Sequence, residues 1–421
     1  MLTTLTALFS TLFDRDAVLL RARELKAVQR VKELHPADML LAIVRSSVGD
    51  EHPSLATARR QLHTATGYMP EESSFYTRIT PGLGDLGWDL FLRALSKANR
   101  VQRQSVAKVL GMRVRDVRAI DGSVILLPKR ASPFLPSTDS KHGGFKITAT
   151  LSVVEDLLLS VHITDAKQHD RKAFALPKAV RGVLHLMDRG YSDHGLFAQI
   201  ADGKGFFAIR LKSSSRPVIE SIRGGLAARH LGEPLSRELP IYGVVDLDAQ
   251  FNIRGAAARI FRVVGIPVAK NKAGKADWIW IATNLPEDVA ATTIGTFYRL
   301  RWLIETLFRA LKGIGRLDEL QTANPAIIKT FITATLVGLV LSECICTAMR
   351  VKRPGCDPSL LRVFALFLAN LTRLAAAFAT DRFEDEIERF CVALWREGVN
   401  PNPGRPYTRE LREVDVGRGH L

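Results

Sequence analysis

Several features are scarce in this 421-residue sequence, and each scarcity excludes a class of protein. There are only four cysteines and no Cys-x-x-Cys pair, which excludes a zinc ribbon or disulfide framework and favours reduced thiols in the cytoplasm. The apolar stretch Met1–Phe9 lacks a basic leader and a small-residue cleavage site, so it predicts an amphipathic helix and not a secretion signal. The cysteines are Cys344, Cys346, Cys356 and Cys391.

Long uncharged apolar runs are also missing. The longest candidate, Thr330–Ser342, is bounded by Lys329 and Glu343 and is shorter than the ~20 residues that a bilayer requires. We therefore predict a buried helix here and expect no membrane partner.

Acidic residues are outnumbered by basic ones, 43 to 59, which gives a net charge of +16 and a pI near 9.9. A protein this basic commonly binds a polyanion, although an acidic membrane surface would compete with nucleic acid on charge alone. The hydrophobic fraction of 47% is that of a globular protein, and the length predicts two to four domains.

The segment Phe297–Lys312 has the pattern of a helix with one functional face. At about 100° per residue, an arc of roughly 60° holds Tyr298, Arg301, Glu305 and Lys312, with Arg309 beside them. Apolar residues fill the adjoining arc, which predicts that the polar face lies at the rim of a core. The alternative is an ordinary solvated face with an i,i+4 pair between Arg301 and Glu305.

Two β-type segments upstream end in aspartate. Val117–Asp121 is followed by Gly122, and the buried run from Gly182 ends at Asp188. Between them lie two further strands, Lys146–Val153 and Leu157–Ile163, joined by a hairpin turn.

The elements that follow complete a recognisable order. A helix is expected over Asp170–Ala179, a second over Ser192–Ala201, and another strand over Gly205–Lys212. Three antiparallel strands, then helix, strand, helix and strand, is the order of an RNase H-like fold. A single aspartate at a strand end is usually a turn residue or helix cap. Two on neighbouring strands, with a later helical glutamate, form the metal-binding set of that fold.

These motifs together resemble bacterial DDE transposases of the insertion sequence four (IS-four) family, whose signature is Tyr, Arg, Glu and Lys at the spacing seen from Tyr298 to Lys312. The Asp121-Gly122 and Asp188-Arg-Gly-Tyr191 blocks, and the bridge from Thr164 to Asp170, are similar to the family's in the same order. The resemblance covers roughly residues 115–345.

The chemistry of phosphodiester cleavage fits the three carboxylates. Asp121, Asp188 and Glu305 are predicted to bind two Mg²⁺ ions, with Mn²⁺ as a substitute, because hard oxygen ligands with open positions suit these metals. The resemblance implies that Tyr298, Arg301 and Lys312 contact phosphates beside the scissile bond. Weaker candidates for DNA contact are Lys146, Arg210 and Arg309.

The resemblance and the local patterns together predict a mixed α/β protein: an RNase H-like core interrupted by a small β insertion domain, with helical N- and C-terminal regions. The expected divisions are 1–110, a helical region that binds DNA ends; 111–212, the first part of the core; 213–285, the insertion; 286–350, the second part of the core; and 351–421, a helical region with a tail.

Two smaller motifs are weighed against structural explanations. Trp278 and Trp280 point to one face of a predicted strand, where packing is the ordinary role and stacking on an unpaired base the functional one. Gly82-Leu-Gly-Asp-Leu-Gly87 matches the dinucleotide fingerprint, but no strand precedes it, so we interpret it as a loop.

The resemblance implies a cytoplasmic, nucleoid-associated enzyme that cuts transposon-end DNA and joins the freed 3′-hydroxyl to target DNA as a homodimer, possibly by way of a hairpin intermediate. Two alternatives stay open. One is an RNase H-like nuclease without strand transfer, and the other is a basic DNA-binding protein without chemistry.

Overall fold

The computed structural model describes residues 5–6, 9, 14–28, 34–48, 52–101, 108–109, 112–236, 241–268, 277–378, 380 and 382–401. Most of the predicted N-terminal amphipathic helix, part of the basic N-terminal stretches and the predicted tail beyond residue 401 lie outside these ranges.

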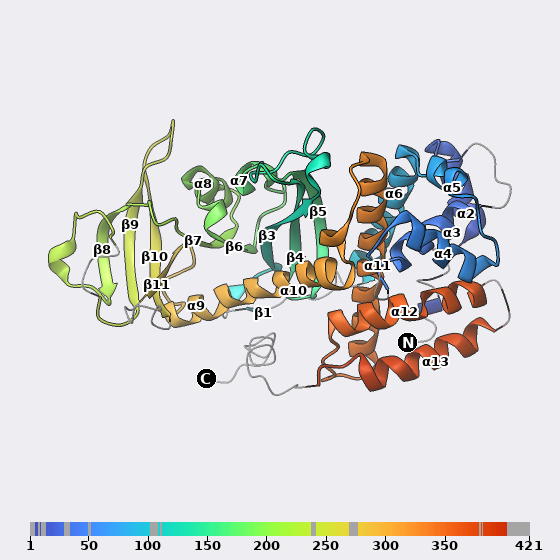
Figure 1. Ribbon diagram of the computed structural model, residues 1–421. Coiled ribbons are helices and arrows are strands. Elements are labelled where there is room, and N and C mark those ends of the chain that lie inside the picture. Colours follow the sequence, from blue (N-terminus) through green and yellow to red (C-terminus); the bar gives the residue numbers. More distant parts are fainter. Residues whose placement is uncertain are drawn as a thin grey trace.

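A nine-stranded mixed sheet forms the centre of the molecule (Figure 1). Its spatial order is β5-β4-β3-β6-β7-β11-β10-β9-β8. The first five strands are β3 (Asp116–Leu127), β4 (Gly143–Ser152), β5 (Leu157–Asp165), β6 (Val183–Met187) and β7 (Phe206–Arg210). Strands β3 to β5 are antiparallel, whereas β3, β6 and β7 are parallel. This arrangement confirms the predicted RNase H-like core.

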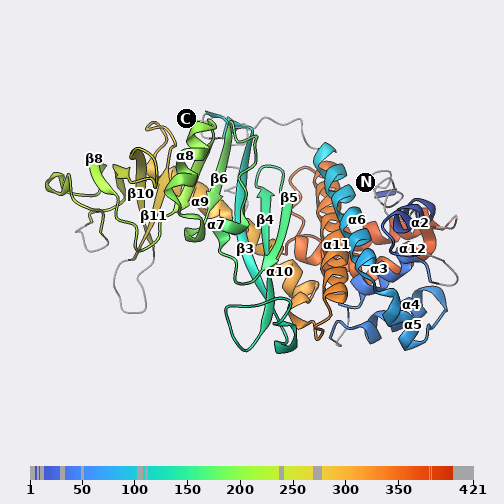
Figure 2. The same cartoon turned by 90° about the horizontal axis from the view of Figure 1, so that it is seen from above.

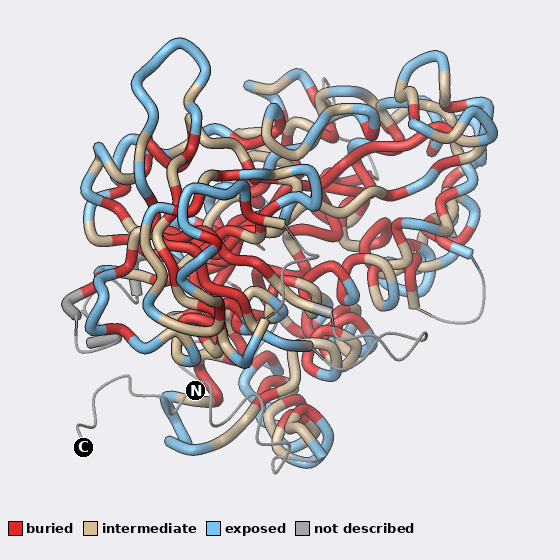
Figure 3. Tube along the Cα trace, turned by 90° about the vertical axis from the view of Figure 1, so that its left-hand side faces the viewer, coloured by how far each residue is buried: buried red, intermediate tan, exposed pale blue. Residues whose placement is uncertain are grey.

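Helices cover both faces of the parallel strands, and the alternation of side chains explains why. On β6, Leu184 and Leu186 pack with the helix α9 (Ala291–Arg299), whereas Met187 packs with α8 (His194–Asp202) on the other face. Buried residues therefore line the strands through the middle of the molecule (Figure 3). The short helix α7 (Asp170–Ala173) ends six residues earlier than predicted, because Pro177 favours extended backbone before it.

The strands of the predicted insertion extend the core sheet and do not form a separate sheet. β11 (Asp277–Thr283) pairs with β7, and β10 (Arg259–Val268), β9 (Val245–Phe251) and β8 (Val218–Gly224) follow outward. The sequence patterns indicated three of these strands, as short β-type runs at residues 244–249, 258–264 and 278–282. They missed β8, which is an edge strand whose pairing is broken by irregularities.

A helical body lies beside the β5 edge of the sheet (Figures 1 and 2). It combines the N-terminal helices with three C-terminal ones, so the two ends of the chain share one core. The N-terminal helices are α2 (Arg15–Glu24), α3 (Pro36–Arg45), α4 (Leu55–Thr66), α5 (Glu72–Arg78) and α6 (Pro81–Val101). The C-terminal ones are α11 (Pro325–Lys352), α12 (Leu360–Phe378) and α13 (Phe383–Glu397). Two short antiparallel strands of two residues each, β1 (Lys108–Val109) and β2 (Met112–Arg113), precede the core.

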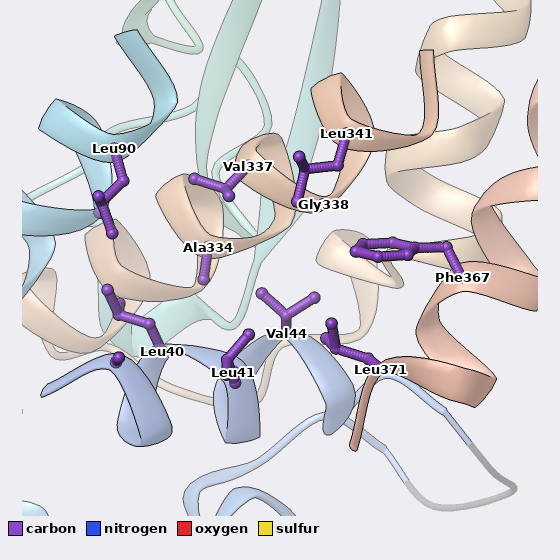
Figure 4. Close-up of a pocket in the computed structure, with 12 residues that line it drawn as sticks. Leu40, Leu41, Val44, Leu90, Ala334, Val337, Gly338, Leu341, Phe367 and Leu371 are labelled. Carbon is purple, nitrogen blue, oxygen red and sulfur yellow. The ribbon is translucent and has the colours of Figure 1, made fainter. Parts of the chain in front are cut away.

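Helices α11 and α12 are long and apolar enough to cross a membrane by length and composition, which is weak evidence for a span. The most apolar window of α11 is 83% buried in the fold, as expected of the predicted core helix. A small apolar cavity of about 40 Å³ remains where α11 meets α3, α6 and α12 (Figure 4).

The glycine motif at residues 82–87 is helical, so its interpretation as a loop was wrong. It forms the first turns of α6, which packs along α11. A Cβ on Gly84 would lie 2.9 Å from the Lys329 side chain, and one on Gly87 would lie 2.3 Å from Thr333 Oγ1. The glycines therefore allow close contact between two helices.

Candidate active site

Asp121 and Asp188 are brought together by the parallel pairing of β3 with β6. Ile120 is aligned with Met187, so the next residue on each strand is an aspartate. Neighbouring strands are about 4.8 Å apart, which places the two carboxylates side by side. β3 continues past Gly122 while β6 ends, and this opens space beside the pair.

The helical segment that carries Glu305 crosses the sheet on the face toward which both aspartates point. It begins as α9, passes through a 3₁₀ turn at Leu300–Trp302, continues as α10 (Leu303–Arg309) and ends in a π-helical turn at Ala310–Ile314. The predicted uniform helix is thus interrupted twice. Such irregular turns are frequent at functional sites.

Side chains from this segment are bonded to the carboxylates. The Arg301 guanidinium donates to Asp121 Oδ2 and lies 3.8 Å from Glu305 Oε1. The Tyr298 hydroxyl donates to Asp188 Oδ1 at 3.2 Å, and Arg210 on β7 lies 3.8 Å from the same oxygen. Arg301, Tyr298 and Arg210 were predicted to contact DNA. In the structure they contact the carboxylates that were predicted to bind metal.

Burial gives the site unusual electrostatics. Burial raises the pKa of Asp121 to about 6, and the nearby charges of Glu305 and Asp188 act in the same direction. The Arg301 guanidinium and a 2.8 Å hydrogen bond from the Gly122 amide oppose this rise. Desolvation also raises the pKa of Tyr298, which stays a neutral phenol able to donate. The site has more negative charge than one guanidinium can balance.

Within the described ranges, no three His, Cys, Asp or Glu side chains are grouped tightly enough to form a ready-made metal site. The donor set nevertheless suits a divalent cation chemically, because three hard carboxylates lie within electrostatic range of Arg301. Asp121, Asp188 and Glu305 would be the ligands.

Three other residues were predicted to contact DNA, and the structure shows their present contacts. Lys146 is buried, and its ammonium donates to Asp170 and to the Gln168 carbonyl; its contact with DNA stays a prediction. Arg309 is exposed and donates to Thr306. Lys312 lies on the π-helical turn, and no hydrogen bond or ion pair joins it to the carboxylates within the described part of the chain.

The two tryptophans of β11 share one face, as predicted, with ring centroids 6.5 Å apart. Trp280 is only 4% exposed and packs over Gly265 of the neighbouring strand, which favours the structural role. Sequence reasoning missed Trp302, which is 63% exposed directly after Arg301. The available signal was an aromatic residue at a helix position outside the predicted apolar stripe, where packing does not require one.

A cleft of about 940 Å³ opens beside the segment. Tyr298, Arg301 and Trp302 form part of its wall, and the C-terminal half of α11 and the loop before α12 form the rest. It continues from Arg210 at the carboxylates to Arg350 on α11, which pairs with Asp156. The basic wall of this cleft leads to the acidic site.

A family model described as the transposase DDE domain matches residues 113–341, more than half of the chain. The chain belongs to this family. The match includes Asp121, Asp188 and Glu305, and transposase DDE domains generally use divalent metal ions.

Individual relatives cover less of this transposase-family chain. The transposase of insertion sequence element IS421 from Escherichia coli is 38% identical over 66 residues, which is 15% of this chain and 18% of that protein. A protein of Sinorhizobium fredii described as a transposase, y4zB, is 24% identical over 240 residues, 56% of this chain and 63% of that protein. The chain thus spans about a fifth of the E. coli relative and less than two thirds of y4zB.

One solved structure, a piggyBac transposase synaptic complex with hairpin DNA, aligns with 99% of this chain and 85% of that chain. Its TM-score is 0.47 at 11% sequence identity, so the likeness carries no argument about function.

Proposed function

We propose that this chain is the transposase of a bacterial insertion sequence of the IS-four type. It would cut the ends of its element by metal-dependent phosphodiester hydrolysis and join the 3′-hydroxyl ends to target DNA. The observation that supports this most strongly is the gathering of Asp121, Asp188 and Glu305 around Arg301, from elements up to 184 positions apart in the sequence.

Each residue has a definite task in this proposal. Asp121, Asp188 and Glu305 hold two Mg²⁺ ions, for which Mn²⁺ can substitute. These ions would neutralise charge on the phosphate and help to activate water. Arg301 and Tyr298 leave the carboxylates and contact phosphate oxygens, for which the guanidinium fork is well suited. Water attacks phosphorus, the bond to the 3′ oxygen breaks, and that oxygen leaves as a hydroxyl.

The partners follow from this chemistry. Transposon-end DNA would lie along the basic wall of the cleft, with Arg309 and Lys312 toward the flanking phosphates, and target DNA would enter after cleavage. Two copies of the chain would hold the two ends in a synaptic homodimer in the cytoplasm. The helical body, which includes the predicted end-binding region 1–110, would contact DNA outside the cleavage site.

We infer that Trp302 stacks on an unpaired base near the cut, a role that the sequence patterns left open beside packing for Trp278 and Trp280. Stacking on an aromatic side chain is worth about 1–3 kcal/mol per base. We therefore expect Trp302→Ala to reduce hairpin formation or end cleavage roughly tenfold or more, while Trp278→Ala has a small effect. Equal rates for the two variants in a gel assay would refute this assignment.

One incubation separates the proposed function from its alternatives. Purified protein is mixed with labelled element ends, a supercoiled target plasmid and Mg²⁺, Mn²⁺ or EDTA. A transposase yields 3′-hydroxyl ends and joined products in either metal and neither in EDTA. Cutting without joining would identify the nuclease alternative, and DNA that stays intact in all three conditions would identify a binding protein.

A further inference from the structure

An ion pair between Lys146 and Asp170 lies behind the strands that carry Asp121 and Asp188, on the face opposite to Arg301. Gly122 is aligned with Thr148 on β4, and both point away from the side occupied by Asp121. On that face Asp170, the first residue of α7, lies against Gly122: a Cβ placed on the glycine would be 3.1 Å from Asp170 Oδ1.

The same carboxylate also lies against the turn that follows Asp188. A Cβ on Gly190 would be 2.3 Å from Asp170 Oδ2, closer than any real contact, so only glycine fits there without movement. Asp170 therefore contacts the backbone one residue after Asp121 and two residues after Asp188. A single side chain thus lies against both strand ends that carry them.

Asp170 is itself held in place. Lys146 on β4 donates to Asp170 Oδ1 at 2.8 Å and to the Gln168 carbonyl at 2.6 Å, and the lysine side chain is only 9% exposed. Next to it, Phe174 and the fully buried Tyr191 meet edge to face at 5.8 Å, which joins the end of α7 to the turn after Asp188. The carboxylate is about one-third exposed, and its buried lysine partner and the neighbouring aromatic contact limit its freedom to move.

We propose that Asp170 is a positioning residue, and that the Lys146–Asp170 pair sets the spacing of Asp121 and Asp188 and thereby the affinity of the site for divalent metal. This inference rests on the proposed function only in taking these aspartates as metal ligands. It gives Lys146 a role behind the site in place of the predicted phosphate contact. Groups that orient metal ligands typically account for 10- to 100-fold in affinity or activity.

The first test compares Asp170→Asn with a matched control. Asp116→Asn removes a carboxylate from the other end of β3, where it accepts bonds from Arg118 and Ser152. Mn²⁺ affinity is measured directly by electron paramagnetic resonance, with Mg²⁺ as competitor, together with the melting temperature. We expect Asp170→Asn to weaken metal binding about tenfold or more, whereas the control keeps the wild-type affinity. Equal affinities for the wild type and Asp170→Asn would overturn the proposal.

A variant that removes both charges of the Lys146–Asp170 pair controls for loss of stability in Asp170→Asn. If Asp170→Asn alone melts much earlier than the control, Lys146→Met with Asp170→Asn leaves no buried charge without a partner. The proposal expects this double variant to fold and still to bind Mn²⁺ at least tenfold more weakly than the wild type. Wild-type affinity in the folded double variant would contradict it.

A double-mutant cycle tests the contact itself. Gly190→Ala should weaken metal binding because its methyl group displaces Asp170, so combining it with Asp170→Ala should cost less than the sum of the two single losses. Strict additivity would contradict the proposal.

Failure of the proposed function is distinguishable from failure of this proposal, because the wild-type protein would then neither bind Mn²⁺ nor cut element ends.

Discussion

At the scale of single residues, Arg301 has the largest consequence. Its side chain is only 13% exposed and it balances the charges of Asp121 and Glu305. Removing one partner of a buried ion pair costs about 3–5 kcal/mol, because the remaining charge is left unbalanced. Arg301→Met should therefore lower the melting temperature of the metal-free protein. Mg²⁺ should raise that temperature more in the variant than in the wild type, since the ion no longer competes with the guanidinium.

Arg309→Met is the control for this experiment. Arg309 is on the same helical segment but is exposed, and among the residues that the structure describes its hydrogen bond is to Thr306. Calorimetry with and without Mg²⁺ should show a small change in this variant. If Arg301→Met responds to Mg²⁺ no more than Arg309→Met does, then Arg301 does not occupy the metal position.

Sequence patterns identified the candidate carboxylates but not their present partners. The spacing of Tyr298, Arg301 and Glu305 predicted one polar face, and the three do meet at one site. That Arg301 and Tyr298 bond to the aspartates, and Lys146 to Asp170, depends on contacts between residues 24 to 180 positions apart, which no local pattern contains. The role of Lys312 stays a prediction.

At the scale of elements, α11 carries an acid in its buried half. Glu343 accepts a hydrogen bond from the Leu158 amide, and burial raises its pKa to about 8 from an ordinary value of 4.5. Between these values the folded state binds more protons than the unfolded state. The stability contributed by the neutral acid is therefore complete below pH 4.5 and is lost as the pH rises through 8, a difference on the order of 5 kcal/mol.

Glu343→Gln keeps an acceptor for Leu158 and removes the titration. We expect the wild-type melting temperature to fall more steeply than that of the variant between pH 5.5 and 8.5, so that the variant is the more stable protein at the alkaline end. The difference between the two curves isolates this one group. Parallel curves would show that Glu343 is ionised at neutral pH in the fold.

The contact of α11 with α3, α6 and α12 leaves space for one more methyl group. The cavity of about 40 Å³ is lined by apolar groups, among them Val337, Ala334 and Leu40 (Figure 4). At about 24 cal/mol per Å³ of cavity, Val337→Ile should raise the free energy of unfolding by up to about 1 kcal/mol, measured by denaturant titration. Val340→Ile is the control: its side chain is fully buried outside the cavity, so overpacking should destabilise it. Stabilisation by both, or by neither, would contradict the cavity argument.

Helix periodicity predicted the Glu305 element but could not predict its irregular turns. A constant 100° per residue assumes an α-helix throughout, whereas the segment passes through 3₁₀ and π turns. The error at Gly82–Gly87 has a different origin: the motif was judged by the strand that should precede a nucleotide-binding turn, whereas its glycines allow close contact between α6 and α11.

At the scale of the whole molecule, the order of strands carried most of the fold prediction. Alternating side chains and turn residues gave β3 to β7 in sequence, and the RNase H-like arrangement follows from that order. The joining of β8 to β11 onto the same sheet could not be predicted, because it depends on the long-range pairing of β11 with β7. The shared core of the two chain ends likewise depends on α6 meeting α11.

The whole fold brings three acids from β3, the end of β6 and α10 to one place, and the proposed function depends on them acting together. The most direct test is cleavage of labelled element ends in Mg²⁺ by the wild type and by Asp121→Asn, Asp188→Asn and Glu305→Gln, each shown by gel shift to bind the ends. A shared metal site predicts that every variant binds DNA normally and cuts at least about 10³-fold more slowly. Wild-type cleavage by any one of the three would contradict it.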